Sequence, residues 1–440
     1  MIYFFLYNLV LLVSFPFISV YLFFASIFSN KWQGTLHERN GYYGKKFAAG
    51  GAKRIWVHAV SVGEVVGAIL LVRLLMQRET DYEIVVSTTT RGGMEMLKRN
   101  FSGGVILFYF PLDFPWTIRR TLRTISPAAV VLMETEIWPN LLRACEASSI
   151  SAILLNGRVS DRMAGAGWFV RGLYRWAFGR IAAAGMQSER DSERLALIAS
   201  PRGEVVVTGN MKFDYLLAAA EGEKVQTLRE VFDVENRRLF VAGSTHPGED
   251  EIILDVYEKI IKVHGDIALV LCPRHVERAD EVVQLVIARG LQVVKRSKIT
   301  PNHEPRTANK GRNAIPTVIV IDTIGELRLL YGIATVCFVG GSLVPRGGHN
   351  VLEPAACGKA PFYGQFTQNF LSAVETLENY KGGIMASDGD ELAEKVLYYL
   401  NNKDYMREID GNARKAVEAN TGAVDRAYAL LKKHLVINNK

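Results

Sequence analysis

The sequence predicts an α/β protein made of two doubly wound halves that follow an apolar N-terminal segment. Three observations lead to this fold class. Short β-rich runs alternate with helical patterns along most of the chain, this series of strands occurs twice, and residues 1–30 are almost continuously apolar. Such alternation favours parallel sheets with crossover helices. A chain of 440 residues is also long enough for about two domains.

The N-terminal segment, residues 1–30, has no charged side chain, and the first charge is on Lys31. An apolar run of at least ~18 residues can span a bilayer as a helix. A cleaved signal peptide would carry basic residues before the run. Here the basic residues follow it, which predicts that the bulk of the protein is cytoplasmic. We expect a spanning or deeply inserted anchor. A helix that lies in the interface, or dips in and returns at Pro16, is the alternative.

The two halves are predicted at residues 31–217 and 218–440, with a polar boundary region near 215–238. Strands are expected in the first half at 54–59, 83–88, 105–110, 128–133, 152–156 and 205–208, and in the second at 239–242, 268–272, 292–295, 318–321, 336–339 and 360–363. Helices are expected at 65–78, 138–147, 249–264, 276–289, 325–332 and 350–357. Residues 300–315 are expected to form an exposed loop. The C-terminal 391–435 should be helical with a break near 420–422, and its last helices are expected to pack back on the first half.

Ligands of such sheets bind beyond the carboxyl ends of the strands. We therefore expect two halves that face a cleft, with an acceptor on the first half and a donor on the second.

Three polar strings of the first half follow predicted strands. Glu64 ends the string HAVSVGE, in the first turn of a helix. A carboxylate there is either a helix cap or a general base, and position alone favours the cap. Glu134 and Glu136 lie two residues apart in METEIWPN, where Pro139 suits a first helical turn. Lys212, in GNMKFD, is placed to meet an anionic donor.

Four polar loops of the second half also follow predicted strands, and we expect them to surround one pocket. They are the strings GSTHPGE, CPRHVER, DTIGEL and GGSLVPRGGHNVLEP. The predicted helix start at Asn350, behind a glycine loop, is typical of an anion site. Arg274 offers a planar fork for phosphate, and Glu353 is placed to accept hydrogen bonds from ribose hydroxyls.

Composition and spacing argue against several other classes of site. The net charge of +7 includes a basic cluster beside the apolar segment, which suits an anionic membrane surface, and no nucleic-acid motif is present. The four cysteines are isolated and are expected to be reduced core residues. Asp388 and Asp390 resemble a metal-binding DxD motif, but a helix cap explains them. No metal-ligand spacing, Walker loop or dinucleotide fingerprint is found, so no cofactor is expected.

Together these strings resemble the bacterial 3-deoxy-D-manno-octulosonic acid (Kdo) transferases, which have the GT-B fold. The resemblance runs from the apolar segment almost to the C-terminus. It implies a membrane-anchored, inverting enzyme that needs no metal or cofactor, on the cytoplasmic face of a bacterial inner membrane. The donor would be CMP-Kdo and the acceptor lipid IVA, a lipid A precursor, with no nucleic-acid partner.

The resemblance also implies roles for single residues. Glu64 matches the family's proton acceptor, and Glu134 and Lys212 match positions that stabilise the transition state. The positions that match CMP contacts are Pro273, Arg274, Ile324, Gly325, Glu326, Asn350, Val351, Leu352 and Glu353. Two alternatives stay open: a GT-B transferase that uses another nucleotide sugar on a membrane lipid, and a nucleotide-binding membrane adaptor without activity. The acids at 64 and 134 argue against the adaptor.

Overall fold

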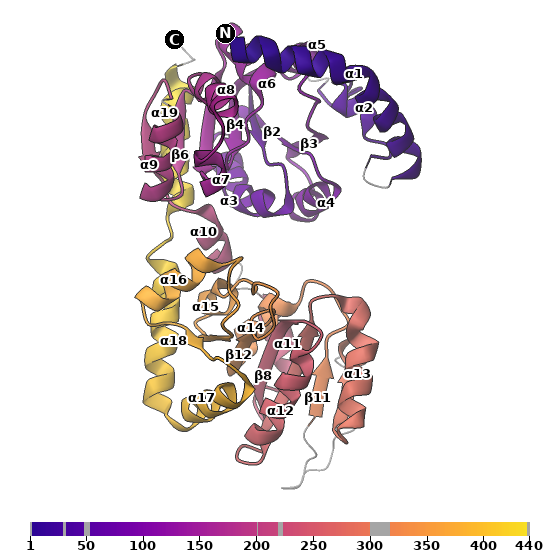
Figure 1. The fold of residues 1–440 in the computed structure, drawn as a ribbon, viewed down its shortest axis with the longest axis vertical. Helices are drawn as coiled ribbons and strands as arrows, with labels where there is room; N and C mark the ends of the chain where they lie inside the picture. The colour runs from indigo at the N-terminus through magenta and orange to yellow at the C-terminus, as the bar shows by residue number, and fades with distance from the viewer. Residues whose placement is uncertain are drawn as a thin grey trace. The chain divides into compact units, whose positions relative to one another are not determined.

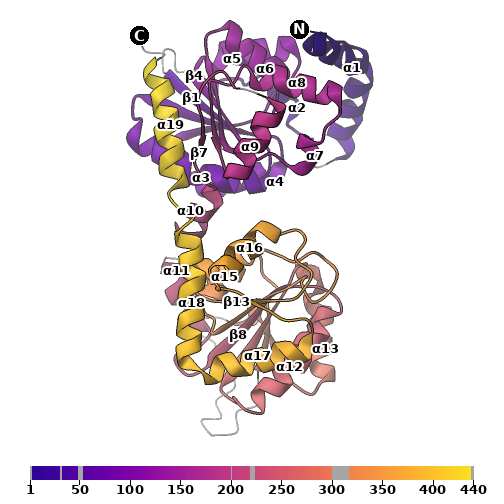
Figure 2. The ribbon, with the colours of Figure 1, turned by 60° about the vertical axis from the view of Figure 1, so that its left-hand side comes forward.

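The computed structural model describes residues 2–29, 32–47, 53–199, 201–218, 223–299 and 317–437. The chain forms two compact units (Figures 1 and 2). Unit 1 comprises Met1–Tyr215 and Asn420–Lys440, and unit 2 comprises Leu216–Ala419. Each unit is built around a seven-stranded parallel sheet, and the apolar N-terminal segment is a helix of unit 1.

The sheet of unit 1 has the strand order β3-β2-β1-β4-β5-β6-β7. Its strands are β1 (Lys53–His58), β2 (Tyr82–Thr88), β3 (Val105–Tyr109), β4 (Pro127–Met133), β5 (Ser151–Gly157), β6 (Ala183–Met186) and β7 (Val205–Val207). Its helices are α1 (Ile2–Phe28), α2 (Leu36–Arg39), α3 (Val62–Arg78), α4 (Arg91–Asn100), α5 (Pro115–Ile125), α6 (Pro139–Ala147), α7 (Asp161–Ala164), α8 (Trp168–Phe178), α9 (Glu189–Ile198) and α19 (Ala423–Ile437). The central strands are buried on both faces, which explains their continuous apolar runs.

The sheet of unit 2 has the order β10-β11-β9-β8-β12-β13-β14. Its strands are β8 (Arg238–Thr245), β9 (Ile267–Pro273), β10 (Gln292–Lys295), β11 (Thr317–Val320), β12 (Val336–Val339), β13 (Pro361–Tyr363) and β14 (Ile384–Met385). Its helices are α11 (Glu223–Val231), α12 (Glu249–Ile261), α13 (Ala279–Ala288), α14 (Leu327–Ile333), α15 (Leu352–Ala356), α16 (Leu371–Asn379), α17 (Gly389–Asn401) and α18 (Lys403–Glu418), with the short 3-10 helices η1 (Val276–Arg278) and η2 (Arg296–Lys298). Helix α10 (Met211–Ala218) lies where the two units join along the chain.

All twelve predicted strands occur, with ends that differ by a few residues, but two short strands were not predicted. These are β6, of four residues, and β14, of two. Three helical predictions need correction. The helix expected at 276–289 is η1 followed by α13, the helix expected at 350–357 is only the five residues of α15, and Asn402 separates α17 from α18. The loop expected at 300–315 lies outside the described residues.

In each sheet the order in which successive strands are added reverses direction beside a central strand. In unit 1 this point lies between β1 and β4, and in unit 2 it lies between β8 and β12. The loops after adjacent strands diverge there and leave room for a ligand beyond the carboxyl ends. The strings that contain Glu64 and Glu134 follow β1 and β4, and the strings GSTHPGE and GGSLVPRGGHNVLEP follow β8 and β12. The topology therefore places these strings at the expected ligand-binding edges.

Helix α1 passes through Pro16 without a break, so the alternative in which the segment turns back at Pro16 is wrong. Residues Ile2–Ala25 are long and apolar enough to cross a membrane, by length and composition. The four cysteines form no disulfide, and three of them are buried.

Candidate functional site

Glu64 lies in the first turn of α3 and is buried, with 7% of its surface exposed. Its Oε2 accepts a hydrogen bond from the Val60 N–H at 2.7 Å, and its Oε1 accepts one from the Ser61 hydroxyl at 3.0 Å. These contacts resemble a capping box, in which an acid reaches back across the start of its helix. The carboxylate is therefore a cap in this structure, and each oxygen keeps a lone pair for a further partner.

Glu134 follows β4 in a backbone conformation that is uncommon for a residue other than glycine. Its φ is +54°, in the left-handed region, and its N–H donates to the Leu155 carbonyl at 2.9 Å. The carboxylate accepts a hydrogen bond from Lys212 Nζ at 2.6 Å. Such a conformation costs roughly 1–3 kcal/mol and tends to occur at functional sites. The strain makes Glu134 a candidate functional residue on physical grounds.

Lys212 is held in place from several directions. The Asn156 side chain, at the end of β5, accepts a hydrogen bond from the Met211 N–H at 3.0 Å, and Asn210 Oδ1 accepts one from the Lys212 N–H at 3.0 Å. One turn later, Asp214 accepts from the N–H groups of Gly422 and Ala423 at the start of α19. The C-terminal helix thus helps to fix the segment that presents the Lys212 ammonium.

A third carboxylate, Glu136, completes this cluster. Burial is the largest cause that raises the pKa of Glu136, and together with the nearby carboxylates of Glu64 and Glu134 it brings this pKa to about 7. Burial also raises the pKa of Glu64; repulsion from Glu134 adds to this rise, whereas the Val60 and Ser61 hydrogen bonds and Lys212 oppose it. Three acids and one lysine at one sheet edge can hold and move a proton, and they can stabilise a cationic centre. We call Glu64, Glu134, Glu136 and Lys212 the acidic cluster.

The loops of unit 2 are organised around Glu249, whose role sequence reasoning missed. This fully buried carboxylate accepts hydrogen bonds from the N–H groups of His246, Gly341, Ser342 and Leu343, at 3.3, 2.6, 3.1 and 2.9 Å. Burial raises its pKa, and the four N–H groups oppose that rise. Glu249 therefore ties the glycine loop after β12 to the loop after β8. Its position at a helix start is the only sequence signal, because the loop lies far away in the sequence.

Two histidines meet above this glycine loop. His246 Nε2 lies 2.9 Å from His349 Nε2, and the two rings are parallel with centroids 5.2 Å apart. Burial lowers the pKa of His349 to about 4, and the charges of Arg274, His246 and His275 contribute. Burial likewise lowers the pKa of His246, with Arg346 as the next cause. The pair is therefore uncharged near neutral pH, and one ring donates its proton to the other.

Arg274 follows Pro273 at the end of β9, and its side chain is exposed. Its N–H donates to the Thr245 carbonyl at 2.9 Å, which fixes the backbone beside the loop after β8. The Arg274 charge lowers the pKa values of both His349 and Glu353. The structure thus places Arg274 within electrostatic reach of the loop after β12, where an exposed guanidinium can bind a phosphate.

The segment Ile324–Gly325–Glu326 precedes α14. Gly325 has a φ of +93°, which a residue with a side chain rarely adopts, and the Ile324 side chain is 82% exposed. The Glu326 carboxylate accepts a hydrogen bond from Arg296 at 2.9 Å and another from the Thr323 hydroxyl. Because its side chain is engaged in this way, Glu326 offers a ligand mainly its backbone.

The segment Asn350–Glu353 runs into α15. Its helix begins at Leu352, not at Asn350, and has only five residues, so the anion site predicted at this helix start lacks a helix of useful length. Burial raises the pKa of Glu353, while Arg328, Asn350 and Arg274 oppose the rise. Val351 and Leu352 are buried. Asn350 and Glu353 are therefore the polar side chains that this segment can offer to a ligand.

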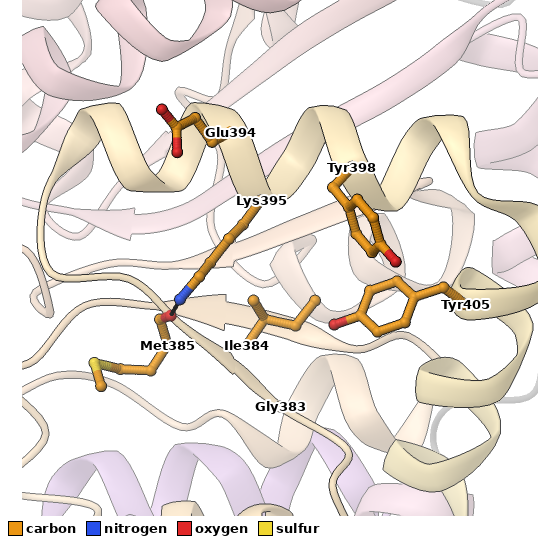
Figure 3. Close-up of a pocket in the computed structure, with 7 residues that line it drawn as sticks. All are labelled: Gly383, Ile384, Met385, Glu394, Lys395, Tyr398 and Tyr405. Carbon is orange, nitrogen blue, oxygen red and sulfur yellow. Dashed lines mark hydrogen bonds between the residues drawn. The ribbon is translucent and has the colours of Figure 1, made fainter.

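Two other features of unit 2 lie apart from these loops. Asp388 caps α17 by accepting a hydrogen bond from the Glu391 N–H at 2.9 Å, and Asp390 pairs with Lys259, so the cap interpretation is confirmed. A pocket of ≈ 600 Å³ lies between β14 and helices α17 and α18 (Figure 3), where Lys395 donates to the Met385 carbonyl. It contains none of the predicted site residues. Among the described residues, no group of three or more His, Cys, Asp or Glu side chains is arranged to hold a metal ion.

Comparison with known proteins gives consistent matches. Residues 34–215 match the family model of 3-deoxy-D-manno-octulosonic-acid transferase (kdotransferase). A 3-deoxy-D-manno-octulosonic acid transferase of Haemophilus influenzae is 33% identical over 435 residues, which cover 99% of each chain. One from Bordetella pertussis is 29% identical over 91% of this chain and 92% of its own. Among solved structures, a putative UDP-N-acetylglucosamine 2-epimerase of Listeria monocytogenes covers 87% of this chain and 95% of its own, with 14% identity and a TM-score of 0.56. That likeness concerns the fold alone.

Proposed function

Because the chain belongs to the 3-deoxy-D-manno-octulosonic acid transferase family, we propose that it transfers Kdo from CMP-Kdo to lipid IVA, a lipid A precursor, in the synthesis of the lipopolysaccharide core. The observation that carries this proposal is the match to a full-length relative over 99% of both chains. The acidic cluster supports the chemistry, because strained and mutually perturbed carboxylates at a sheet edge are typical of a site that moves protons.

In the proposed reaction Glu64 acts as the general base. It takes the proton from a hydroxyl of the acceptor, and that oxygen forms a bond to the anomeric carbon of Kdo. The bond from this carbon to the CMP phosphate oxygen breaks, and CMP leaves with the electron pair. Direct attack of this kind inverts the anomeric centre, as in inverting glycosidases. The raised pKa of Glu64 supports this role, because a stronger base accepts the proton more readily.

Glu134 and Lys212 are proposed to stabilise the transition state. The sugar acquires positive charge as its bond to CMP breaks, and a fixed carboxylate stabilises such a charge. The Lys212 ammonium offers the opposite charge to a departing phosphate. Their direct pairing at 2.6 Å supports a prebuilt arrangement that needs little reorganisation during the reaction.

The loops of unit 2 are proposed to bind CMP. Arg274 would contact the phosphate and Glu353 the ribose hydroxyls, while the exposed Ile324 side chain and the backbone of Gly325 and Glu326 would contact the base. The remaining proposed contacts are Pro273, Asn350, Val351 and Leu352. A phosphate monoester has a second pKa near 6, so CMP can depart without an acid catalyst if its charge is matched. We propose that the Lys212 and Arg274 side chains supply the positive charge that matches the departing CMP, and that no metal is required.

Helix α1 is proposed to attach the enzyme to the cytoplasmic face of a bacterial inner membrane. Its apolar composition and the basic residues that follow it support this placement.

The proposed transfer of Kdo is tested by mass spectrometry of lipid IVA after incubation with CMP-Kdo and the full-length protein. A mass gain of one or more Kdo residues is expected. Turnover with a UDP- or ADP-sugar, and none with CMP-Kdo, would favour the alternative GT-B transferase.

A further inference from the structure

Helix α1 packs against unit 1 through one face. Its buried and half-buried side chains recur every three or four residues and form one stripe, whose members include Phe4, Tyr7, Leu11, Ser14, Ile18, Leu22 and Ala25. At 1.5 Å per residue, the stripe from Phe4 to Ala25 is roughly 30 Å long. That is about the thickness of the hydrocarbon core of a bilayer. Among the residues that the structure describes, Ile2–Ala25 is the segment long and apolar enough to span a membrane, and it does not extend freely from unit 1.

Specific contacts hold the N-terminal half of α1 in this position. Phe4 stacks on Trp176 of α8 with centroids 4.6 Å apart. Phe15 meets Trp116 of α5 edge-on at 5.4 Å. The Tyr7 hydroxyl donates to the Asp113 carboxylate at 3.0 Å. Figures 1 and 2 show α1 as the dark helix that runs along the outside of unit 1.

The outward face of α1 is apolar throughout. Phe5, Val13, Phe17, Tyr21 and Phe28 are 61–82% exposed, and the helix has no charged residue. Exposed apolar patches of this extent mark binding to a membrane or a protein. Both partners would suit an apolar face, and the helices that contact α1 favour the membrane.

The helices that contact α1 are basic and carry aromatic side chains. Helices α5 and α8 contain five arginines and no acidic residue. Arg119 and Arg123 of α5 are exposed, and so are Arg171 and Arg175 of α8, the helix that begins at Trp168, which is 78% exposed. Tryptophan prefers the level of the lipid headgroups, and arginine is attracted to anionic lipids. This charge pattern complements an anionic bilayer.

We propose that α1 lies in the plane of the membrane interface, and that exposed residues of α5 and α8 form a basic and aromatic rim around it that contacts anionic headgroups. A spanning orientation would either pull α5 and α8 with their arginines into the hydrocarbon, which is costly, or break the whole stripe of contacts. The proposal refines the membrane attachment of the proposed function and does not depend on which sugar is transferred.

This placement also connects the membrane helix with the acidic cluster. The Asp113 carboxylate that accepts the Tyr7 hydroxyl also accepts the N–H groups of Asn140 and Leu141, each at 2.9 Å. Those residues begin α6, directly after the loop of Glu134 and Glu136. The hydrogen bond between Tyr7 and Asp113 therefore links α1 to the start of α6. Helix α6 follows the loop that contains Glu134 and Glu136 of the acidic cluster.

The topology of α1 can be measured on the full chain in native membranes. One cysteine is placed in a short uncharged Gly/Ser extension ahead of Met1, and Leu197→Cys, at a position 72% exposed on α9, serves as the cytoplasmic reference. Both are treated with a membrane-impermeant maleimide in inverted vesicles and in spheroplasts, with the wild type as background. We expect both cysteines to react in inverted vesicles only. Reaction of the N-terminal cysteine in spheroplasts would overturn the proposal.

Vesicle sedimentation tests the rim. With vesicles rich in phosphatidylglycerol, Arg171→Gln and Arg175→Gln should each weaken binding about fivefold, and little change is expected with phosphatidylcholine alone. Arg407→Gln, at an arginine of unit 2 whose side chain is 78% exposed, is the matched control and should bind as the wild type does. Unchanged binding of the arginine variants would contradict the rim. Kdo transfer by the same variants in detergent is measured separately, so a failure of the proposed function is distinguishable from a failure of the topology.

Discussion

Lys212 Nζ lies 2.6 Å from Oε1 of Glu134, a residue whose backbone is held at a φ of +54°. The strained backbone and the ion pair together fix the carboxylate beside Glu64. The charges of this pair act on the pKa of Glu64 in opposite directions, because Glu134 raises it and Lys212 lowers it. Burial is the largest cause of the raised pKa of Glu64, and the two charges of this pair adjust that pKa from either side.

Replacing either partner should shift the pH dependence of transfer. Lys212→Met removes the cation that lowers the pKa of Glu64, so the acidic limb of the kcat/KM profile should move to higher pH. Glu134→Gln removes the repelling carboxylate, so the same limb should move to lower pH. Both variants should also lose rate. Profiles of kcat/KM against pH with lipid IVA provide the measurement, and shifts in the same direction would contradict the arrangement.

Glu64→Gln should reduce transfer by about 10²–10⁴-fold, the usual contribution of a general base. CMP affinity, measured by calorimetry, should stay near the wild-type value because the proposed nucleotide loops belong to unit 2. Glutamine can still accept the Val60 or Ser61 hydrogen bond, so a large loss of stability is not expected. Glu353→Gln is the companion variant and should weaken CMP binding first. Near-normal turnover of Glu64→Gln would reduce Glu64 to a helix cap and make Glu136 the base to test.

The contrast between Glu64 and Glu249 shows how far sequence reasoning reaches. Both acids stand in the first turn of a helix after a parallel strand, and the alternation of strands and helices predicts that position well. The partners of Glu64 lie three and four residues away, so its cap is predictable from the sequence. Three partners of Glu249 lie 92 to 94 residues away, and only the adjacency of β8 and β12 brings them near. Short elements such as β14 escaped prediction because two residues carry no period.

Glu249→Gln should destabilise unit 2 and weaken CMP binding. The glutamine NH₂ group would face backbone N–H groups that now donate to a carboxylate, and leaving such groups unpaired costs on the order of 1–3 kcal/mol. Glu251→Gln changes an exposed acid in the same helical turn and is the matched control. Thermal unfolding by circular dichroism and CMP titration should separate the two variants. Equal behaviour would mean that Glu249 does not hold the glycine loop.

Transfer should continue in excess EDTA. In the proposed reaction the charge of the departing CMP is met by Lys212 and Arg274, so chelation of divalent ions should leave the rate within about twofold of its starting value. The assay uses lipid IVA, CMP-Kdo and protein treated with EDTA before mixing. Loss of activity that magnesium restores would show that the two side chains do not suffice.

Acid should destabilise unit 1 through His58. This residue ends β1 and is fully buried, its ring stacks on Phe110 with centroids 3.8 Å apart, and its Nδ1 lies 2.9 Å from the Ser87 hydroxyl. Burial lowers its pKa to about 3, whereas a histidine in an unfolded chain titrates near 6.5. Between these values the unfolded state binds a proton that the folded state does not. The free energy of unfolding therefore falls with falling pH, by up to about 1.4 kcal/mol per pH unit for this one group.

The His58→Gln variant isolates that contribution. It should be less stable than the wild type at about pH 7, and the difference should shrink as the pH falls toward about 5, because only the wild type loses this contribution. His37→Gln, at an exposed histidine of α2, should give a curve parallel to that of the wild type. All six tryptophans belong to unit 1, so their fluorescence in urea titrations reports the unfolding of that unit. A constant difference between wild type and His58→Gln across this range would show that the folded state accepts a proton on His58.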